Sequence, residues 1–122
     1  MTKRILVVDD DAMYIELVAS LLAPNDVTIF PAPDGSAALK ILESQSVDLI
    51  ISDYNMPVMG GMELHRRVSG SNRFSKIPFV FITGALETQM LAYTDRFTDL
   101  TIILKSELAQ KLSAHVDKLL AS

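Results

Sequence analysis

The chain has 122 residues, no cysteine and a formal net charge of −4 at pH 7, and 49% of its residues are hydrophobic. This length and hydrophobic share predict a single folded domain and exclude a disordered chain. The acidic balance argues against direct binding of nucleic acid, and the lack of cysteine excludes a disulfide framework. No apolar run is long enough for a membrane span or a signal peptide, so we expect a soluble, cytoplasmic protein without a membrane partner.

Strand and helix patterns alternate along the whole chain. Short β-branched runs bounded by turn-forming or acidic residues predict strands at residues 4–8, 27–30, 47–52, 79–83 and 101–104. Helices are predicted at residues 12–22, 36–43, 62–69, 86–97 and 107–121, with Ser106 as the N-cap of the last. The alternation predicts βαβ units with right-handed crossovers. We therefore expect an α/β fold with one doubly wound parallel sheet, forming a single domain over residues 1–122.

Two of the predicted strands end in carboxylates. Asp9, Asp10 and Asp11 follow the first strand, and Asp53 follows the third. Because the carboxyl ends of parallel strands meet at one edge of the sheet, these side chains are expected to lie close together. Like charges that close either raise one another's pKa values or need a cation, and a donor set made only of oxygen suits Mg²⁺. The residues thus predict a divalent-metal site beside one exposed Asp, with Asp11 serving as the cap of the helix that follows.

Four stretches at successive strand ends resemble the motifs of response-regulator receiver domains of two-component signalling. They are ILVVDD at residues 5–10, DYNMPVMGG at residues 53–61, FITG at residues 81–84 and LK at residues 104–105. The resemblance extends over essentially the full chain. It implies the flavodoxin-like, CheY-like (βα)₅ fold with strand order 2-1-3-4-5.

The resemblance also implies the acceptor and the metal ligands. Asp53 resembles the phosphoacceptor, a carboxylate nucleophile that attacks a phosphoryl group. Asp9 and Asp10 resemble the acidic pair that holds Mg²⁺ together with Asp53, and the backbone carbonyl of Asn55 would complete the protein ligands. The chain would be an enzyme only in assisting its own phosphorylation and dephosphorylation.

Two further residues and the partners follow from the same resemblance. The ammonium of Lys105 and the hydroxyl of Thr83 would each take one phosphoryl oxygen, since phosphoryl transfer depends on positioning and charge neutralisation. Thr83 would report phosphorylation by moving toward the new oxygen. The implied donor is a histidine kinase or a histidine phosphotransfer protein, and the output is a conformational change read by a downstream protein that the sequence does not identify.

The chain departs from the receiver pattern in three places. Ser106 follows Lys105 where receivers usually have proline after a cis peptide, so we expect a trans bond. Ile102 stands where many receivers carry a Tyr or Phe whose rotamer change follows the movement of the Thr. Isoleucine has no polar tip and is stiff at χ1, so it cannot follow that movement in the usual way. Thr98 and Asp99 stand where a Gly-Ala step usually ends the fourth helix of receivers. These departures predict normal phosphorylation with an atypical output.

Helix 12–22 carries two apolar stripes, and both histidines lie in helical patterns. The inward stripe is predicted to be Tyr14, Leu17, Val18 and Leu21. The outward stripe would be Ile15, Ala19 and Leu22, which is either a docking patch for a helical phosphodonor or ordinary tolerance of exposed apolar residues. Lacking partners at metal-binding spacing, His65 and His115 are expected on the surface.

Other functions stay open at this point. A pseudo-receiver, an interaction module that is not phosphorylated, is favoured by Ile102 and Ser106 and opposed by the intact acidic residues. A phosphohydrolase of the haloacid dehalogenase type also uses an Asp after a strand, but it needs a second Asp where this chain has Asn55. A flavin-binding protein of the same topology would need a phosphate loop rich in Ser, Thr or Gly after the first strand, where carboxylates stand instead.

Overall fold

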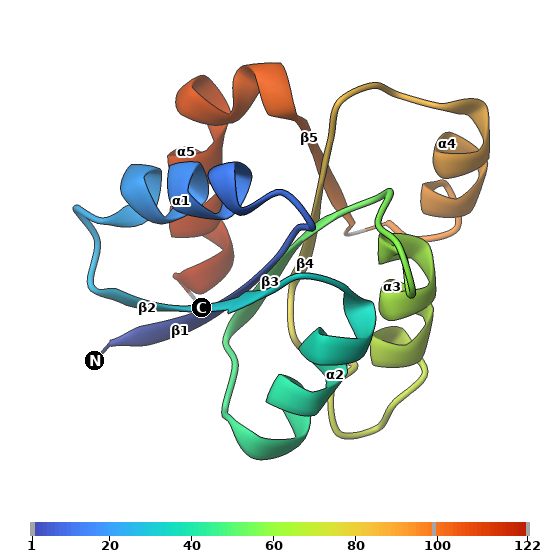
Figure 1. Cartoon of the computed structure of the whole chain (residues 1–122), viewed down its shortest axis with the longest axis horizontal. Helices are drawn as coiled ribbons and strands as arrows, with labels where there is room; N and C mark the ends of the chain where they lie inside the picture. The colour runs from blue at the N-terminus through green and yellow to red at the C-terminus, as the bar shows by residue number, and fades with distance from the viewer. Residues whose placement is uncertain (1, 99, 122) are drawn as a thin grey trace.

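A computed structural model describes residues 2–98 and 100–121. Its centre is a parallel sheet of five strands in the order β2-β1-β3-β4-β5, with helices on both faces (Figure 1). The strands are β1 (Lys3–Val8), β2 (Val27–Ala32), β3 (Leu49–Asp53), β4 (Phe79–Thr83) and β5 (Thr101–Leu104). The helices are α1 (Ala12–Leu22), α2 (Gly35–Ser44), α3 (Gly61–Ser69), α4 (Thr88–Thr94), the 3₁₀ turn η1 (Lys105–Glu107) and α5 (Leu108–Leu120). The predicted fold class and strand order are confirmed.

The strand register brings the predicted site residues to one edge of the sheet. The central strands β3 and β4 are buried along their whole length, as expected for β-branched runs covered by helices on both faces. Val8 pairs with Ser52, Asp53 with Ile82, and Thr83 with Leu104. The residues that end β1, β3, β4 and β5 therefore lie side by side.

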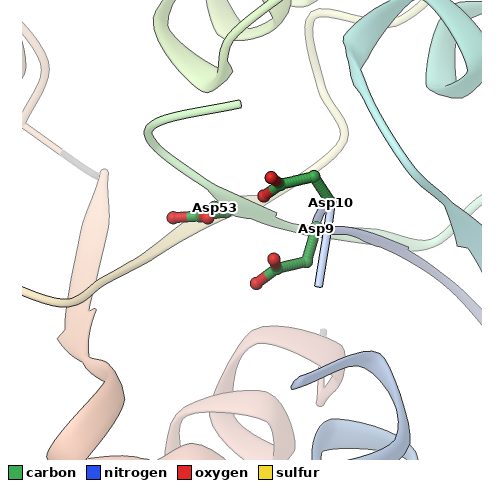
Figure 2. A group of neighbouring side chains, drawn as sticks. All are labelled: Asp9, Asp10 and Asp53. Atoms are coloured by element: carbon green, nitrogen blue, oxygen red, sulfur yellow. The ribbon is translucent and has the colours of Figure 1, made fainter. Parts of the chain in front are cut away.

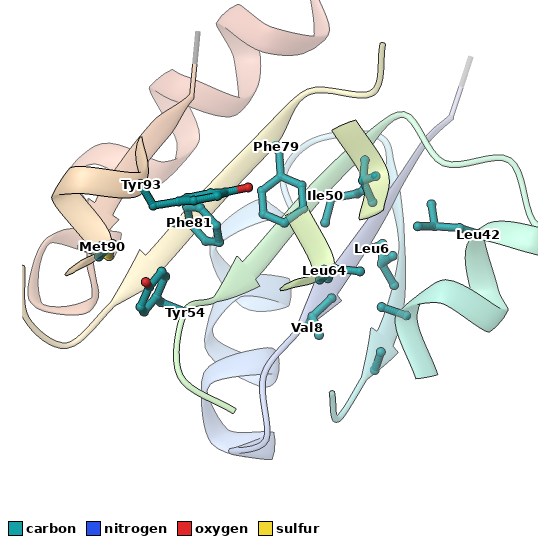
Figure 3. Packing of buried hydrophobic residues seen from close by; sticks show 13 residues of the cluster. Leu6, Val8, Leu42, Ile50, Tyr54, Leu64, Phe79, Phe81, Met90 and Tyr93 are labelled. Atoms are coloured by element: carbon teal, nitrogen blue, oxygen red, sulfur yellow. The ribbon is translucent and has the colours of Figure 1, made fainter. Parts of the chain in front are cut away.

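The two faces of the sheet are packed with different side chains. We call the side covered by α1 and α5 the aliphatic face; its buried residues are Ile5, Val7, Val18, Leu22, Leu49, Ile51, Val80, Ile82, Ile103, Leu108, Leu112 and Val116. We call the side covered by α2, α3 and α4 the aromatic face; Figure 3 shows its rings, with Tyr54, Phe79, Phe81 and Tyr93 packed beside Leu64 and Met90. The site edge is shared by both faces.

The inward stripe of α1 differs in part from the predicted one: Tyr14, Val18 and Leu21 pack on the aliphatic face as predicted, but Leu17 does not. Leu22 is fully buried and Leu17 is 38% exposed, while Ile15 packs against the buried cluster of the aliphatic face. Helix α1 is apolar around most of its circumference, so periodicity alone fits two stripes, and the contacts with α5 and β1 select the one that contains Ile15, Val18 and Leu22. The outward stripe of Ile15, Ala19 and Leu22 was wrong, and so was the docking patch based on it.

Most bounds agree with the sequence expectations or differ by one or two residues, and three differences concern Pro31, the end of α4 and Ser106. Pro31 lies inside β2, which tolerates proline because it is an edge strand. Helix α4 ends at Thr94, and a turn closed by the bond from the Phe97 amide to the Thr94 carbonyl follows it. Ser106 lies in η1 instead of capping α5.

Several other expectations concern the backbone and the histidines. No peptide bond within the described ranges is cis, in agreement with the trans bond expected after Lys105. His65 is only 6% exposed, so its predicted surface position was wrong, and His115 is half-buried.

The step at Thr98-Asp99 falls partly on residue 99, which lies outside the described residues. No helix in the described part of the chain is both long and apolar enough to cross a membrane.

Candidate functional site

Three carboxylates converge at the shared edge of the sheet. Asp9 and Asp10 follow β1, and Asp53 is the last residue of β3. Each offers an oxygen that lies within 4.8 Å of the oxygens offered by the other two, and their side chains project to the same side of the strand ends (Figure 2). Asp9 and Asp53 are buried, whereas Asp10 is exposed. The sequence prediction of a carboxylate cluster is borne out in its geometry.

A chain of hydrogen bonds fixes the loop between β1 and α1. The Asp11 amide donates to Asp9 Oδ1 at 2.9 Å, and the Met13 amide donates to Asp11 Oδ1 at 2.9 Å. Asp11 is therefore the N-cap of α1, as its position predicted. The Asp9 amide donates to the Ala32 carbonyl at 3.0 Å. Asp11 thus caps α1, and Asp9 and Asp10 belong to the carboxylate cluster.

Lys105 supplies the cation of this edge. Its Nζ lies 2.9 Å from Asp9 Oδ2 and 3.2 Å from Asp53 Oδ2, with 12% of the side chain exposed. The same ammonium lies 3.9 Å from the centroid of the Tyr14 ring, a distance at which the ring face attracts a cation. Lys105 is thus enclosed by two carboxylates and one aromatic face.

Burial and the neighbouring charges shift both titrating partners. Burial, followed by the charge of Asp9, raises the pKa of the Asp53 carboxyl, while Lys105 and the Tyr54 amide oppose the shift. Burial by itself lowers the pKa of Lys105, but its hydrogen bonds and attraction to Asp9 and Asp53 outweigh burial and leave the pKa raised. The site therefore favours the protonated form of Lys105. An additional cation beside Asp53 would stabilise its ionised carboxylate.

The donor set fits a hard divalent cation. Three ionised carboxylates and one ammonium leave a formal charge of −2, which one Mg²⁺ neutralises. All the side-chain donors are oxygen atoms, the ligands that Mg²⁺ prefers. Asn55 Nδ2 donates to Glu87 Oε1 at 3.2 Å, and the ligand role predicted for this residue concerns its main-chain carbonyl.

Thr83 is placed beside the cluster with its hydroxyl engaged elsewhere. It is buried at the end of β4 and donates to the Ala85 carbonyl at 2.9 Å. Its strand pairing with Leu104 sets it next to the residue that precedes Lys105. The predicted side chains therefore occupy one strand edge, with Asp9, Asp53 and Lys105 in direct contact.

The loop after Asp53 is closely constrained. A Cβ at Gly61 would collide with the Asp53 carbonyl oxygen, so only glycine fits this approach. Val58 has a positive φ of 68°, and the Met59 amide donates to the Pro57 carbonyl at 2.8 Å. This is a tight three-residue turn of a kind that is strained for a β-branched residue.

Sequence reasoning missed two residues near the site. Tyr14 was predicted to be part of the helix core, and Glu87 was not singled out at all. The signal available for Tyr14 was an aromatic residue in the first turn of the helix that follows the acidic pair. Glu87 precedes α4 and meets Asn55 only through the fold, so no local pattern indicated it.

Comparisons with known proteins show which family the chain is similar to. Residues 5–117 match the model of the response regulator receiver domain family. The chain is 38% identical over 91 residues to the CAI-1 autoinducer sensor kinase/phosphatase CqsS of Vibrio cholerae, covering 74% of this chain and 13% of that protein. It is 28% identical to the chemotaxis protein CheY of Pseudomonas aeruginosa, covering 95% of this chain and 94% of that protein.

A solved structure shares the fold over nearly the whole length. The signal receiver domain of an HD domain-containing protein from Pseudomonas fluorescens superposes with a TM-score of 0.90 and 25% identity, covering 99% of this chain and 96% of that one. Together with the family match, this superposition confirms the resemblance seen in the sequence. The chain belongs to the response regulator receiver domains, the signalling modules of two-component systems.

Proposed function

We propose that this receiver domain, formed by residues 1–122, accepts a phosphoryl group on Asp53 from the phosphohistidine of a histidine kinase or a phosphotransfer protein. The observation that carries the proposal is the contact of the Asp53 carboxylate with Lys105 beside Asp9 and Asp10. A nucleophile next to a fixed cation and a metal-ligand set is what phosphoryl transfer requires. The signal would pass to a downstream protein through a conformational change.

The reacting carboxylate is held from both sides. The Tyr54 amide donates to Asp53 Oδ1 at 2.8 Å, and Lys105 Nζ lies at Asp53 Oδ2. One carboxylate oxygen bonds to phosphorus as the bond between phosphorus and the donor nitrogen breaks, and the electron pair leaves with the donor imidazole. Lys105 then pairs with a phosphoryl oxygen, where negative charge is greatest.

The acidic cluster would bind Mg²⁺ in this proposal. Asp9, Asp10 and Asp53 supply carboxylate oxygens, and the Asn55 carbonyl supplies a main-chain oxygen. When bound, the ion neutralises charge on the transferring phosphoryl group. Asp9 thereby has two roles, since it contacts Lys105 in the metal-free protein and is a ligand of the metal-bound form.

Thr83 would transmit the change. Its hydroxyl exchanges the Ala85 carbonyl for a phosphoryl oxygen, and this exchange pulls the start of the loop between β4 and α4. Ile102 on β5 has no ring or hydroxyl that could follow this movement. We therefore expect the output to act through the β4–α4 loop itself.

Intact-mass labelling with a small acyl phosphate tests the proposal. The native chain is treated with and without Mg²⁺ beside Asp53→Asn and a control, Asp117→Asn, which removes an exposed carboxylate on α5. We expect one phosphoryl group on the native chain and on the control only when Mg²⁺ is present. Asp53→Asn is expected to lose the adduct completely.

Three other outcomes would overturn it. A folded native chain that gains no mass would be a pseudo-receiver. An adduct that persists on Asp53→Asn would mean a different acceptor. Continuous release of phosphate without an accumulating adduct would indicate a phosphohydrolase.

A further inference from the structure

The ammonium of Lys105 has an aromatic neighbour that the proposed chemistry does not use. Nζ lies 3.9 Å from the centroid of the Tyr14 ring, close to its contacts with Asp9 and Asp53. A cation this near a ring face, in a partly buried place, interacts with the ring more strongly than at an exposed site. The two carboxylates hold the ammonium from the strand ends, and the ring holds it from α1.

The position of the ring is determined by the loop that carries the acidic pair. The Tyr14 amide donates to the Asp11 carbonyl at 3.0 Å in the first turn of α1. Asp11 is held in turn by Asp9 Oδ1 through its amide. The ring and the Asp9 carboxylate are therefore fixed to one short segment, and any change in that segment moves both contacts of Lys105.

The lysine needs such support. Its side chain is a flexible four-carbon stem that loses considerable rotamer freedom when it is held in one place. It begins in η1, one residue after β5 ends, and Ser106 follows it without the ring of a proline to stiffen the turn. The carboxylate contact to Asp9 is also temporary in the proposed mechanism, because Asp9 becomes a metal ligand. The Tyr14 ring is a contact for which neither the metal nor the phosphoryl group competes.

We infer that Tyr14 is a positioning residue that keeps the Lys105 ammonium directed at Asp53 through the face of its ring. This inference rests on the proposed function for its consequence in phosphoryl transfer, but the contact itself is a property of the metal-free, unphosphorylated protein. Because the ring acts by its face, Phe can replace Tyr14. Leu fills similar space without a π system and cannot replace it.

The experiment compares Tyr14→Phe, Tyr14→Leu and the native chain. The first measurement is the proton shift of the Lys105 methylene next to Nζ, by NMR on metal-free protein, because a ring face shields nearby protons. We expect an upfield shift in the native chain and in Tyr14→Phe that is lost in Tyr14→Leu. The second measurement is the rate of Mg²⁺-dependent labelling, which we expect Tyr14→Leu to lower roughly five- to thirtyfold, the effect of a partly desolvated cation–π contact, and Tyr14→Phe to leave unchanged.

Phe30→Leu is the matched control. It removes a ring that lies 5.1 Å from the Arg4 guanidinium, a second cation–π pair well separated from the site edge in the strand register. It should leave both the Lys105 shift and the labelling rate unchanged. Loss of labelling in this control would mean that any lost ring lowers the rate through stability alone, and the inference would fail.

The remaining outcomes separate this inference from the proposed function. If the Lys105 methylene shift is the same in Tyr14→Leu as in the native chain, the ring does not contact the ammonium and the inference is wrong, whatever the labelling shows. If Tyr14→Leu loses the shift but is labelled at the native rate, the ring does not position Lys105 for transfer. If the native chain is not labelled at all, the proposed function fails, while the shift still tests the contact.

Discussion

The two faces of the sheet are held by different kinds of interaction. The aliphatic face packs branched side chains against α1 and α5, helices of 11 and 13 residues that contact each other. The aromatic face packs the rings of β4 and of Tyr54, which follows β3, against three shorter helices, and α4 has only seven residues. It also buries polar atoms, because the Tyr93 hydroxyl and His65 Nδ1 share a hydrogen bond of 2.6 Å.

The helices of the aliphatic face are held by burial of apolar side chains, whereas α4 is held by contacts that depend on orientation. Burial of aliphatic side chains is a non-directional source of stability. Edge-on rings and a buried hydrogen bond are satisfied in few orientations. The His65 ring meets Phe79, Tyr93 and Phe97 edge-on. We therefore expect α1 and α5 to act as the fixed half of the domain, and α4 as the half whose position depends on a few specific contacts.

The largest expected effect on stability comes from a variant that disrupts the packing of the aliphatic face. Leu22→Ala removes a fully buried side chain of α1 and should lower the free energy of unfolding by about 3 kcal/mol, through lost burial and the cavity that remains. Urea unfolding monitored by circular dichroism measures it. Leu17→Ala, on the 38% exposed side of the same helix, is the control and should cost less than about 1 kcal/mol. Equal costs would contradict the orientation of α1.

A smaller effect probes the hydrogen bond of the aromatic face. Tyr93→Phe keeps the ring of α4 but removes the hydroxyl bonded to His65, and we expect a loss of about 1 kcal/mol in the free energy of unfolding. Tyr54→Phe is the matched control, because the Tyr54 hydroxyl is buried without a hydrogen-bond partner among the described residues. Its removal should be neutral or slightly stabilising. If the two variants behave alike, the buried bond does not hold α4.

The smallest effect lies at the edge that the two faces share. Burial and the charge of Asp9 raise the pKa of Asp53 above its ordinary value of 3.8, so the folded chain holds this proton more tightly than the unfolded chain. Stability from this group is therefore present at low pH and is lost as the pH rises through the pKa of the folded state. Without metal, Asp53→Asn should therefore be more stable than the native chain at neutral pH, by less than the change expected for Tyr93→Phe, because the ion pair with Lys105 offsets part of the burial cost.

The measurement is urea unfolding of both chains in a metal chelator across the acidic range. The gain of Asp53→Asn should shrink as the pH falls toward the ordinary pKa of Asp, because the native carboxyl is then protonated in both states. A variant that is less stable than the native chain at neutral pH would show that the ion pair with Lys105 outweighs burial.

Sequence patterns predicted the elements whose signal is local and missed the contacts that only the fold creates. The bounds of β4, β5 and α1 were predicted correctly because the residues that end a β-branched run or cap a helix lie next to it in the sequence. The carboxylate cluster was predictable because parallel strands end at one edge. The burial of His65 was not, since its ring partners come from β4 and from the α4 region, far along the chain. The exposure of Leu17 and the burial of Leu22 were not, because α1 is apolar on both sides.

The left-handed turn at Val58 has a consequence for the populations of the loop beside Asp53. A β-branched residue with φ of 68° raises the energy of the resting loop by about 1–2 kcal/mol compared with glycine at the same position. Any alternative arrangement that returns Val58 to negative φ recovers this energy. Each 1.4 kcal/mol or so recovered makes that minor arrangement about tenfold more populated before any ligand or modification is present. Val58, whose side chain is 87% exposed, thereby lowers the free energy that separates the resting loop from any such arrangement.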